Sequence, residues 1–274
     1  MNETKEEMRR PLLGTLERGL AILEFLSEND RVTVPRLAEA LNLKRSTVYR
    51  LVNMLQERGY VESPRGSSEV VLGTRAVKLG VSAMSSADIL QVAPAPMKEL
   101  ASGGLGTVFL AIPDGDCMVY VAREEGPQAI NLSARLGTRR PLHCTALGKA
   151  YLSALPVDER RSVVEGLEMA RQTPNTITSP QALLEELSET AVRGYAVDRV
   201  ENEEGVACVA APIRDYGGRP IASVSLAGVA ATILEKVPEL GVRINRTSAE
   251  MSREMGWQGP EAVRETGNRR EAAG

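Results

Sequence analysis

A chain of 274 residues is long enough for two domains of ordinary size, and its composition, 43% hydrophobic and 25% charged, is that of a globular protein. The net charge is −3, but residues 31–80 hold nine Lys and Arg against four Asp and Glu, so this segment is +5 and the remainder −8. The overall charge argues against a general nucleic-acid coat protein. A basic segment on an acidic chain is instead typical of a DNA-binding module joined to a domain that does not bind DNA.

The three cysteines, Cys117, Cys144 and Cys208, are odd in number and widely spaced. This spacing provides neither a disulfide framework nor a CxxC metal knuckle, and it suits a reducing cytoplasm. The N-terminal segment MNETKEEMRR is charged and lacks the apolar stretch of a signal peptide. No uncharged run is long enough to span a bilayer. We therefore expect a cytoplasmic protein with no membrane partner.

In chain order, polar residues 1–14 predict a flexible arm. The next segment, GTLERGLAILEFLSEND, has apolar residues at helical spacing and predicts an amphipathic helix that ends at Asn29 and Asp30. From Thr33 to Leu55 the pattern predicts two short helices joined by a tight turn. Thr33 is a suitable N-cap, and Asn42 tolerates the left-handed backbone that such a turn requires. This order is typical of a helix-turn-helix motif.

The second helix of the motif carries the residues that indicate DNA binding. Val48, Leu51, Val52 and Leu55 follow i, i+3, i+4, i+7 spacing and share one apolar face. The opposite face presents guanidinium, amide, hydroxyl and aromatic groups, which can contact phosphates and base edges in a major groove. The plainer alternative is a solvated helix in an ordinary helical domain. The predicted DNA-binding residues are Arg36, Lys44, Arg45, Ser46, Thr47, Tyr49, Arg50, Asn53 and, further along the chain, Arg65.

Gly59 is placed to end this helix, and the following YVESPRGSSEVVLG predicts two short strands with Arg65 at the turn between them. Residues 15–73 therefore predict a winged helix-turn-helix domain, mostly α with a β wing. Residues 74–91 predict a linker helix between two domains. Such a helix often carries a dimer contact, which suits a homodimer or a dimer of dimers reading a palindromic double-stranded operator.

Residues 92–257 predict an α+β domain in which hairpin-linked strands form an antiparallel sheet flanked by helices. Helices are expected at 145–155, 157–170 and 180–193 and in a final stretch to about Gly256. The polar residues 258–274 predict a disordered tail. The expected strands are TVFLAIP, DCMVYVAR, QAINLSA, YAVD, VACVAAPI and PIASVSLAG.

Several long segments resemble the IclR family of bacterial transcriptional regulators, over about residues 15 to 256. They are LERGLAILEFL, RSTVYRLVNMLQERGYVE, PLHCTALGKAYLSALP, NTIT, GYAVDRVENEEGVACVAAPI and SVSLAG. The resemblance implies a dimeric or tetrameric DNA-binding protein, a repressor or dual regulator of a catabolic operon. Its C-terminal domain would be similar to GAF folds and bind a small effector, commonly an organic or aromatic acid. By this resemblance the effector site comprises Cys144, Thr145, Ala146, Leu147, Asp198, Cys208, Ser225 and Ala227.

Some members of the family have a serine where Ala227 stands, so one hydroxyl is missing here and a small, highly polar effector such as a keto acid is less expected. Read without the family, HCTALGKA is a loop entering a helix whose first N–H groups favour an anion. Thr145 is the N-cap, a ligand contact, or both. Lys149 faces either the site or solvent. Asp198 either hydrogen-bonds a ligand hydroxyl or holds the loop that follows it.

An enzyme is the alternative class. His143 is the only histidine, no GxSxG elbow is present, and Cys144 is its direct neighbour in sequence. Cys117 and Cys208 are the thiols left to form a Cys-His pair with it, but they pack more readily as core residues, so we predict no catalytic residues. A metal site built from His143, Cys144, Asp198 and Cys208 is conceivable, but no ligand pair among them has a local structural-zinc spacing, so we predict no metal ligand and no cofactor. The alternative function is a small-molecule sensor or enzyme whose helix-turn-helix contacts protein, and operator binding distinguishes the two.

Overall fold

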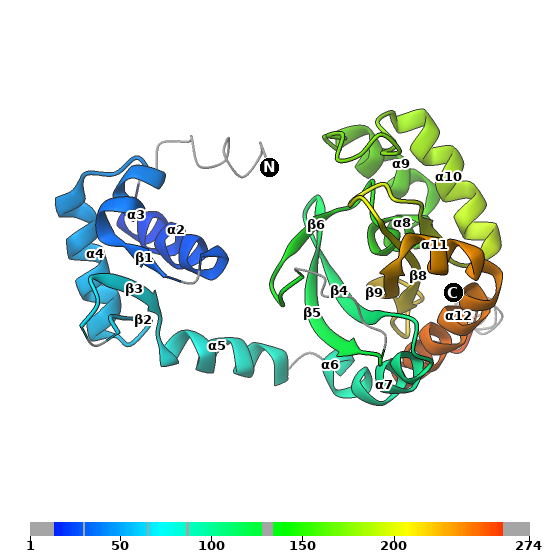
Figure 1. Cartoon of the computed structure of the whole chain (residues 1–274), viewed down its shortest axis with the longest axis horizontal. Coiled ribbons are helices and arrows are strands. Elements are labelled where there is room, and N and C mark those ends of the chain that lie inside the picture. Colours follow the sequence, from blue (N-terminus) through cyan, green and yellow to red (C-terminus); the bar gives the residue numbers. More distant parts are fainter. Residues whose placement is uncertain (1–13, 30, 65, 86–87, 128–133, 260–274) are drawn as a thin grey trace, which may run out of the picture. The chain divides into compact units, whose positions relative to one another are not determined.

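The computed structural model describes residues 14–29, 31–64, 66–85, 88–127 and 134–259 (Figure 1). The chain divides into two compact units, Met1–Ser86 and Ala87–Gly274. Apart from Gly14, Gln258 and Gly259, the expected arm and tail lie outside the described residues. Among the helices of the described part, none is long and apolar enough to cross a membrane.

The N-terminal unit contains the predicted helix-turn-helix and wing. The strands are antiparallel in the order β1-β3-β2, so that Val32 and Thr33 add a third strand that the sequence did not predict. The elements are α2 (Thr15–Glu28), β1 (Val32–Thr33), α3 (Val34–Ala40), α4 (Arg45–Glu57), β2 (Val61–Glu62) and β3 (Glu69–Leu72).

The turn between α3 and α4 has the predicted geometry. Asn42 adopts a φ of 51° and Gly59, beyond α4, a φ of 72°, both in the left-handed region. Thr33 occupies the N-cap position of α3, but its side chain makes no cap hydrogen bond. Its backbone pairs with Glu69 of β3 instead. Thr33 is therefore a strand residue of the three-stranded sheet and does not cap α3 through its hydroxyl.

Residues 74–91, which were expected as one linker helix, contribute to two helices. The first is α5 (Thr74–Ser85), and α6 (Asp88–Val92) follows after two residues outside the described set. Ile89 of α6 is 6% exposed and belongs to the core of the C-terminal unit, next to residues of α7 (Pro94–Ser102). The end of the segment therefore has a core to pack into, which the sequence did not indicate.

The C-terminal unit is built on a six-stranded antiparallel sheet in the order β6-β5-β4-β9-β8-β7. This arrangement confirms the predicted α+β class. The expected strand at 128–134 falls mostly on undescribed residues, and Ala134 is not in a strand. The strand β6 was not expected. The strands are β4 (Thr107–Asp114), β5 (Cys117–Glu125), β6 (Arg139–Pro141), β7 (Ala196–Asp198), β8 (Val206–Arg214) and β9 (Pro220–Val229).

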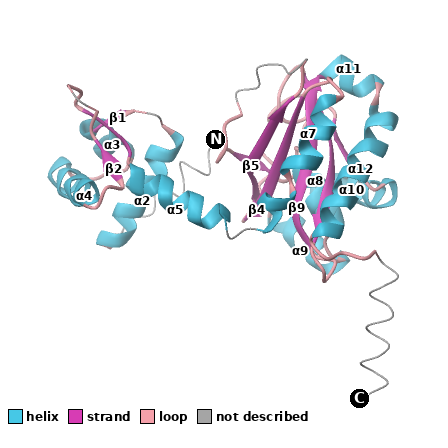
Figure 2. Ribbon diagram, turned by 90° about the horizontal axis from the view of Figure 1, so that it is seen from below, coloured by secondary structure: helices cyan, strands magenta, loops and turns pink. Residues whose placement is uncertain are grey.

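Helices cover both faces of this sheet (Figures 1 and 2). Along β4, Val108 and Leu110 pack into one core while Phe109 and Ala111 pack into the other, as the period-two alternation of a strand requires. The first core is closed by α7, α11 (Ala230–Glu235) and α12 (Val237–Glu254). The second is closed by α8 (Ala146–Ala154), α9 (Val157–Gly166) and α10 (Pro180–Arg193). Helix α9 ends at Gly166, four residues before the predicted end.

Candidate functional site

The outward face of α4 is exposed. Tyr49 is half exposed, at 50%, while the neighbouring Val48 is fully buried in the core of the unit. Leu55, predicted for the apolar face, is only half-buried. Six of the predicted DNA-binding residues are classed as exposed and Thr47 as half-buried; the six are Lys44, Arg45, Ser46, Tyr49, Arg50 and Asn53.

Arg36 lies on α3 and is also exposed, but its guanidinium donates a hydrogen bond to Glu39 at 3.0 Å. Arg36 and Arg45 both line a surface groove of about 480 Å³ beside the Asn42 turn. Residues of both helices of the motif therefore line the groove, near the first residue of α4. Arg65, the predicted wing contact, lies outside the described residues.

In the C-terminal unit, the register of the sheet brings predicted residues from three strands into one row. Asp198 of β7 pairs with Cys208 of β8, Cys208 pairs with Ala227 of β9, and Ala227 pairs with Thr107 of β4. Directly cross-strand side chains share a face and lie about 5 Å apart. Ser225 occupies the next row on the same face. Sequence reasoning missed Thr107, because its place in this row depends on the pairing of strands far apart in the chain.

The start of α8 packs over this face, and Cys144, Thr145, Ala146 and Leu147 are all buried. Thr145 is the N-cap: its hydroxyl accepts a hydrogen bond from Gly148 N at 3.1 Å and donates one to Pro141 O at 2.8 Å. The capping role of Thr145 is therefore present in the structure.

Lys149 does not face solvent. Its side chain is 1% exposed, and its Nζ lies 2.5 Å from Glu201 Oε1 and 3.8 Å from Glu186 Oε1. Glu201 N in turn donates a hydrogen bond to Asp198 Oδ1 at 2.7 Å. Asp198 therefore holds the turn that follows β7, and the buried ion pair ties this turn to α8.

The same turn is fixed from its other side by the loop before α10. Val200 adopts a φ of 64°, a left-handed conformation that is strained for a β-branched residue. Thr173 Oγ1 donates to Val200 O at 2.6 Å, and Thr176 Oγ1 donates to Glu201 O at 2.6 Å. Asn175 Nδ2 donates to Arg199 O, just before Val200, at 3.1 Å. These hydrogen bonds hold a conformation that the local sequence does not favour.

Burial dominates the electrostatics of the site. It raises the pKa of Asp198 to about 7, helped by the nearby Glu201 carboxylate and opposed by hydrogen bonds from backbone amides. Burial also raises the pKa of the Cys144 thiol to about 12 and that of Cys208 well above its ordinary value, with Asp198 adding to both. Both thiols are therefore protonated near neutral pH, and neither is an activated nucleophile.

His143 is buried beside this region, and its Nε2 lies 3.1 Å from Ala170 O. Burial lowers the pKa of His143, so the ring is neutral at pH 7 and donates this hydrogen bond. In the part of the chain that the structure describes, no three His, Cys, Asp or Glu side chains are grouped to hold a metal ion.

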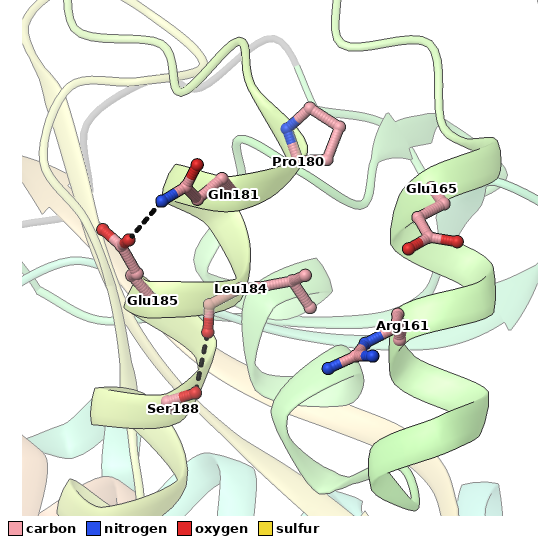
Figure 3. Close-up of a pocket in the computed structure, with 7 residues that line it drawn as sticks. All are labelled: Arg161, Glu165, Pro180, Gln181, Leu184, Glu185 and Ser188. Atoms are coloured by element: carbon pink, nitrogen blue, oxygen red, sulfur yellow. Dashed lines mark hydrogen bonds between the residues drawn. The ribbon is translucent and has the colours of Figure 1, made fainter.

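A groove of about 460 Å³ between α9 and α10 contains none of the predicted site residues (Figure 3). Two of its hydrogen bonds are internal to α10, from Gln181 to Glu185 and from the Ser188 hydroxyl to Leu184 O. The groove is thus a surface feature of two packed helices. It is lined by Arg161, Glu165, Pro180, Gln181, Leu184, Glu185 and Ser188.

Comparison with known proteins agrees with this two-unit architecture. The family model described as IclR helix-turn-helix domain matches residues 15–65, and the model described as bacterial transcriptional regulator IclR C-terminal matches residues 81–253. Among curated relatives, the HTH-type transcriptional regulator XynR of Escherichia coli is 31% identical over 90% of this chain and 99% of its own length. The E. coli regulator KdgR is 31% identical over 89% of this chain and 94% of its own.

Solved structures give the same result. The IclR structure from Thermotoga maritima is 35% identical with a TM-score of 0.73, covering 89% of this chain and 99% of that one. An IclR homolog from Microbacterium hydrocarbonoxydans, complexed with 4-hydroxybenzoate, has a TM-score of 0.78 over 88% of this chain and 99% of that one, at 22% identity, and shows the shared fold. Because the C-terminal family model alone spans more than half of the chain and XynR matches 90% of it, the chain belongs to the IclR family of bacterial transcriptional regulators, which are DNA-binding proteins rather than enzymes.

Proposed function

We propose that this regulator reads a palindromic operator through α4 and that a small organic or aromatic acid in the C-terminal unit changes its operator affinity. It acts as a homodimer or a dimer of dimers, with residues 15–73 as the DNA-binding domain, 74–91 as the linker and 92–257 as the effector-binding domain. The observation that carries the proposal is the exposed polar face of α4, on a segment of net charge +5 within an acidic chain.

On the DNA side, Arg50, Tyr49, Ser46 and Asn53 reach base edges in the major groove, while cations at the start of α4 contact phosphates. The first residues of a recognition helix are those that enter the groove. The remaining members of the proposed surface are Arg36, Lys44, Arg45, Thr47 and the wing residue Arg65.

On the effector side, the ligand lies between the start of α8 and the sheet face that carries the Asp198 row. An acid is supported by the N-terminus of α8, because the first amides of a helix favour an anion and α8 packs against β8 and β9. That the related fold of the Microbacterium protein was solved with 4-hydroxybenzoate agrees with a ligand of this class. The proposed contacts are Cys144, Thr145, Ala146, Leu147, Asp198, Cys208, Ser225 and Ala227.

A gel-shift titration of the full-length chain on DNA upstream of its own gene, extended to genomic fragments, tests the DNA half. Arg50→Ala is expected to weaken binding by about 1–3 kcal/mol if Arg50 contacts a base, and binding should fall steeply with salt. Arg58→Ala is the matched control, because Arg58 is an exposed arginine just past the opposite end of α4. Failure of the parent chain to retard any fragment, with or without candidate acids, would contradict the proposal.

A further inference from the structure

Two hydroxyl groups on the α8 side of the sheet are buried without a partner. Thr107 and Ser223 are both 0% exposed, and neither Thr107 Oγ1 nor Ser223 Oγ has a hydrogen-bond partner in the described part of the chain. A buried hydroxyl that makes no hydrogen bond costs stability, so such groups are rare in folded proteins. A bound ligand that accepts a hydrogen bond would remove this cost.

Thr107 stands in the row of residues assigned to the effector site. It is the first residue of β4 and lies directly across from Ala227, which pairs onward with Cys208. The methyl group of Ala227 cannot satisfy the Thr107 hydroxyl. On its other side Thr107 faces Glu125 of β5, whose carboxylate is already engaged by Arg123. The Thr107 hydroxyl is therefore available at the end of the row.

Two arginines beside the aromatic pair Phe109 and Tyr120, which lies on the same sheet face as Thr107, also carry hydrogen-bond donors without acceptors. Arg123 lies over the ring of Phe109, at 6.0 Å, and Phe109 follows Thr107 on the same face of β4. Arg140 lies over Tyr120, also at 6.0 Å, and the Tyr120 ring stacks on Phe109 with centroids 4.7 Å apart. In both arginines the Nε atom is buried and has no partner among the described residues. Both guanidinium groups already have carboxylate partners, Glu125 for Arg123 and Glu203 for Arg140, so what they leave for a ligand is the two unpaired Nε donors. Unpaired guanidinium N–H groups favour a ligand that carries a carboxylate.

We propose that Thr107 is an effector-binding residue, whose hydroxyl donates a hydrogen bond to a carboxylate oxygen of a small acid seated on the row from Asp198 to Thr107. The inference rests on the proposed effector function of this face and adds a contact from β4 to those on α8, β7, β8 and β9. It also assigns the carboxylate end of the ligand to the Thr107 side of the row, away from the Asp198 carboxyl.

The decisive variant is Thr107→Val, which removes the hydroxyl and keeps the volume and branching of the side chain. Thr107→Ser keeps the hydroxyl. Ser223→Ala is the matched control, because it removes an equally buried, unpartnered hydroxyl from the same face. Ser223 lies four residues along β9 from Ala227, about 13 Å away at the rise of a strand, beyond the reach of a small acid on the row.

The full-length variants are compared by thermal shift with pyruvate, benzoate and 4-hydroxybenzoate, and dissociation constants are then measured by calorimetry for each acid that binds the parent. Thr107→Val is expected to bind about tenfold more weakly or worse, the loss typical of a hydrogen bond to a charged group. Its ligand-free melting temperature should not fall, since an unpaired hydroxyl has been removed. Thr107→Ser and Ser223→Ala should bind within about threefold of the parent. Ala227→Ser, combined with Thr107→Val, should recover part of the loss.

The proposal is overturned if Thr107→Val binds these acids as tightly as the parent, or if Ser223→Ala loses as much. It is also overturned if none of the three acids raises the melting temperature of the parent chain, because the ligand class would then be wrong. Operator binding without added acid is measured in parallel for the parent and for Ser223→Ala, and the two should agree. Failure of the parent chain to bind any operator fragment would instead contradict the proposed function.

Discussion

Lys149 of α8 and Glu201, beyond the end of β7, form an ion pair in which both side chains are almost completely buried, with Nζ 2.5 Å from Oε1. Fifty-two residues separate them in the chain. A buried ion pair is weak evidence for net stability, because both charges lose hydration. Breaking it from one side is nevertheless costly, since the remaining buried charge then has no opposite charge beside it to offset its lost hydration.

Lys149→Met is therefore expected to lower the free energy of unfolding by about 3–5 kcal/mol, because it leaves the Glu201 carboxylate buried and uncompensated. Trp257, the only tryptophan, lies in the C-terminal unit, so its fluorescence during urea denaturation reports on this unit. The double variant Lys149→Met with Glu201→Gln should recover much of the loss. The exposed Lys98→Met is the control, and an equal loss there would contradict the argument.

Asp198 should make stability depend on pH. Its pKa is about 7 in the folded chain against about 3.8 in the unfolded one, so between these values the folded state holds a proton that the unfolded state has released. Stability thus falls as pH rises from about 4 to 7. Asp198→Asn removes this slope, and its advantage over the parent should grow across that window by up to about 4 kcal/mol, at about 1.4 kcal/mol per pKa unit.

Urea denaturation at pH 5, 6, 7 and 8 measures the effect. The difference in unfolding free energy between Asp198→Asn and the parent should rise with pH and level off above 7. The exposed Asp158→Asn serves as the control for removing one carboxylate. A difference independent of pH would mean that Asp198 does not titrate in this window.

Asn42, in the turn of the helix-turn-helix, should be replaceable by glycine but not by alanine. Its φ of 51° costs an ordinary L-residue about 1–2 kcal/mol, whereas glycine adopts it freely. Because Asn42 is exposed, neither change disturbs the core. Hydrogen exchange of the α4 amides should show Asn42→Ala less stable by about 1 kcal/mol and Asn42→Gly close to the parent. Equal stability of the two variants would contradict a strained turn.

The helix-turn-helix could be read from the sequence because its signals are local. Val48, Leu51 and Val52 repeat at helical spacing, and Asn42 and Gly59 stand where the backbone turns left-handed. The antiparallel sheet was also predictable, since its apolar runs are separated by Gly-containing turns. In contrast, β6 is a three-residue edge strand containing Pro141, too short and too polar to leave a period-two pattern.

The chemistry of the effector side was less predictable, because it depends on contacts between distant residues. From the sequence alone, Lys149 could face either the site or solvent. Its partner Glu201 can be identified only from the folded structure, in which β7 packs beside α8. Thr107 was missed for the same reason: its neighbour Ala227 is set by the register of β4 against β9. Neither relationship leaves a signal within a window of a few residues.

The hydrogen bonds from Thr173, Asn175 and Thr176 to the turn at Val200 have a consequence for which substitutions the chain tolerates. Surface loops usually accept sequence changes freely. Here Thr173 and Thr176 are 4% and 5% exposed, and their hydroxyls hold a strained turn that carries Glu201. The loop containing NTIT should therefore be as intolerant of random mutation as a helix core, although it has no regular secondary structure.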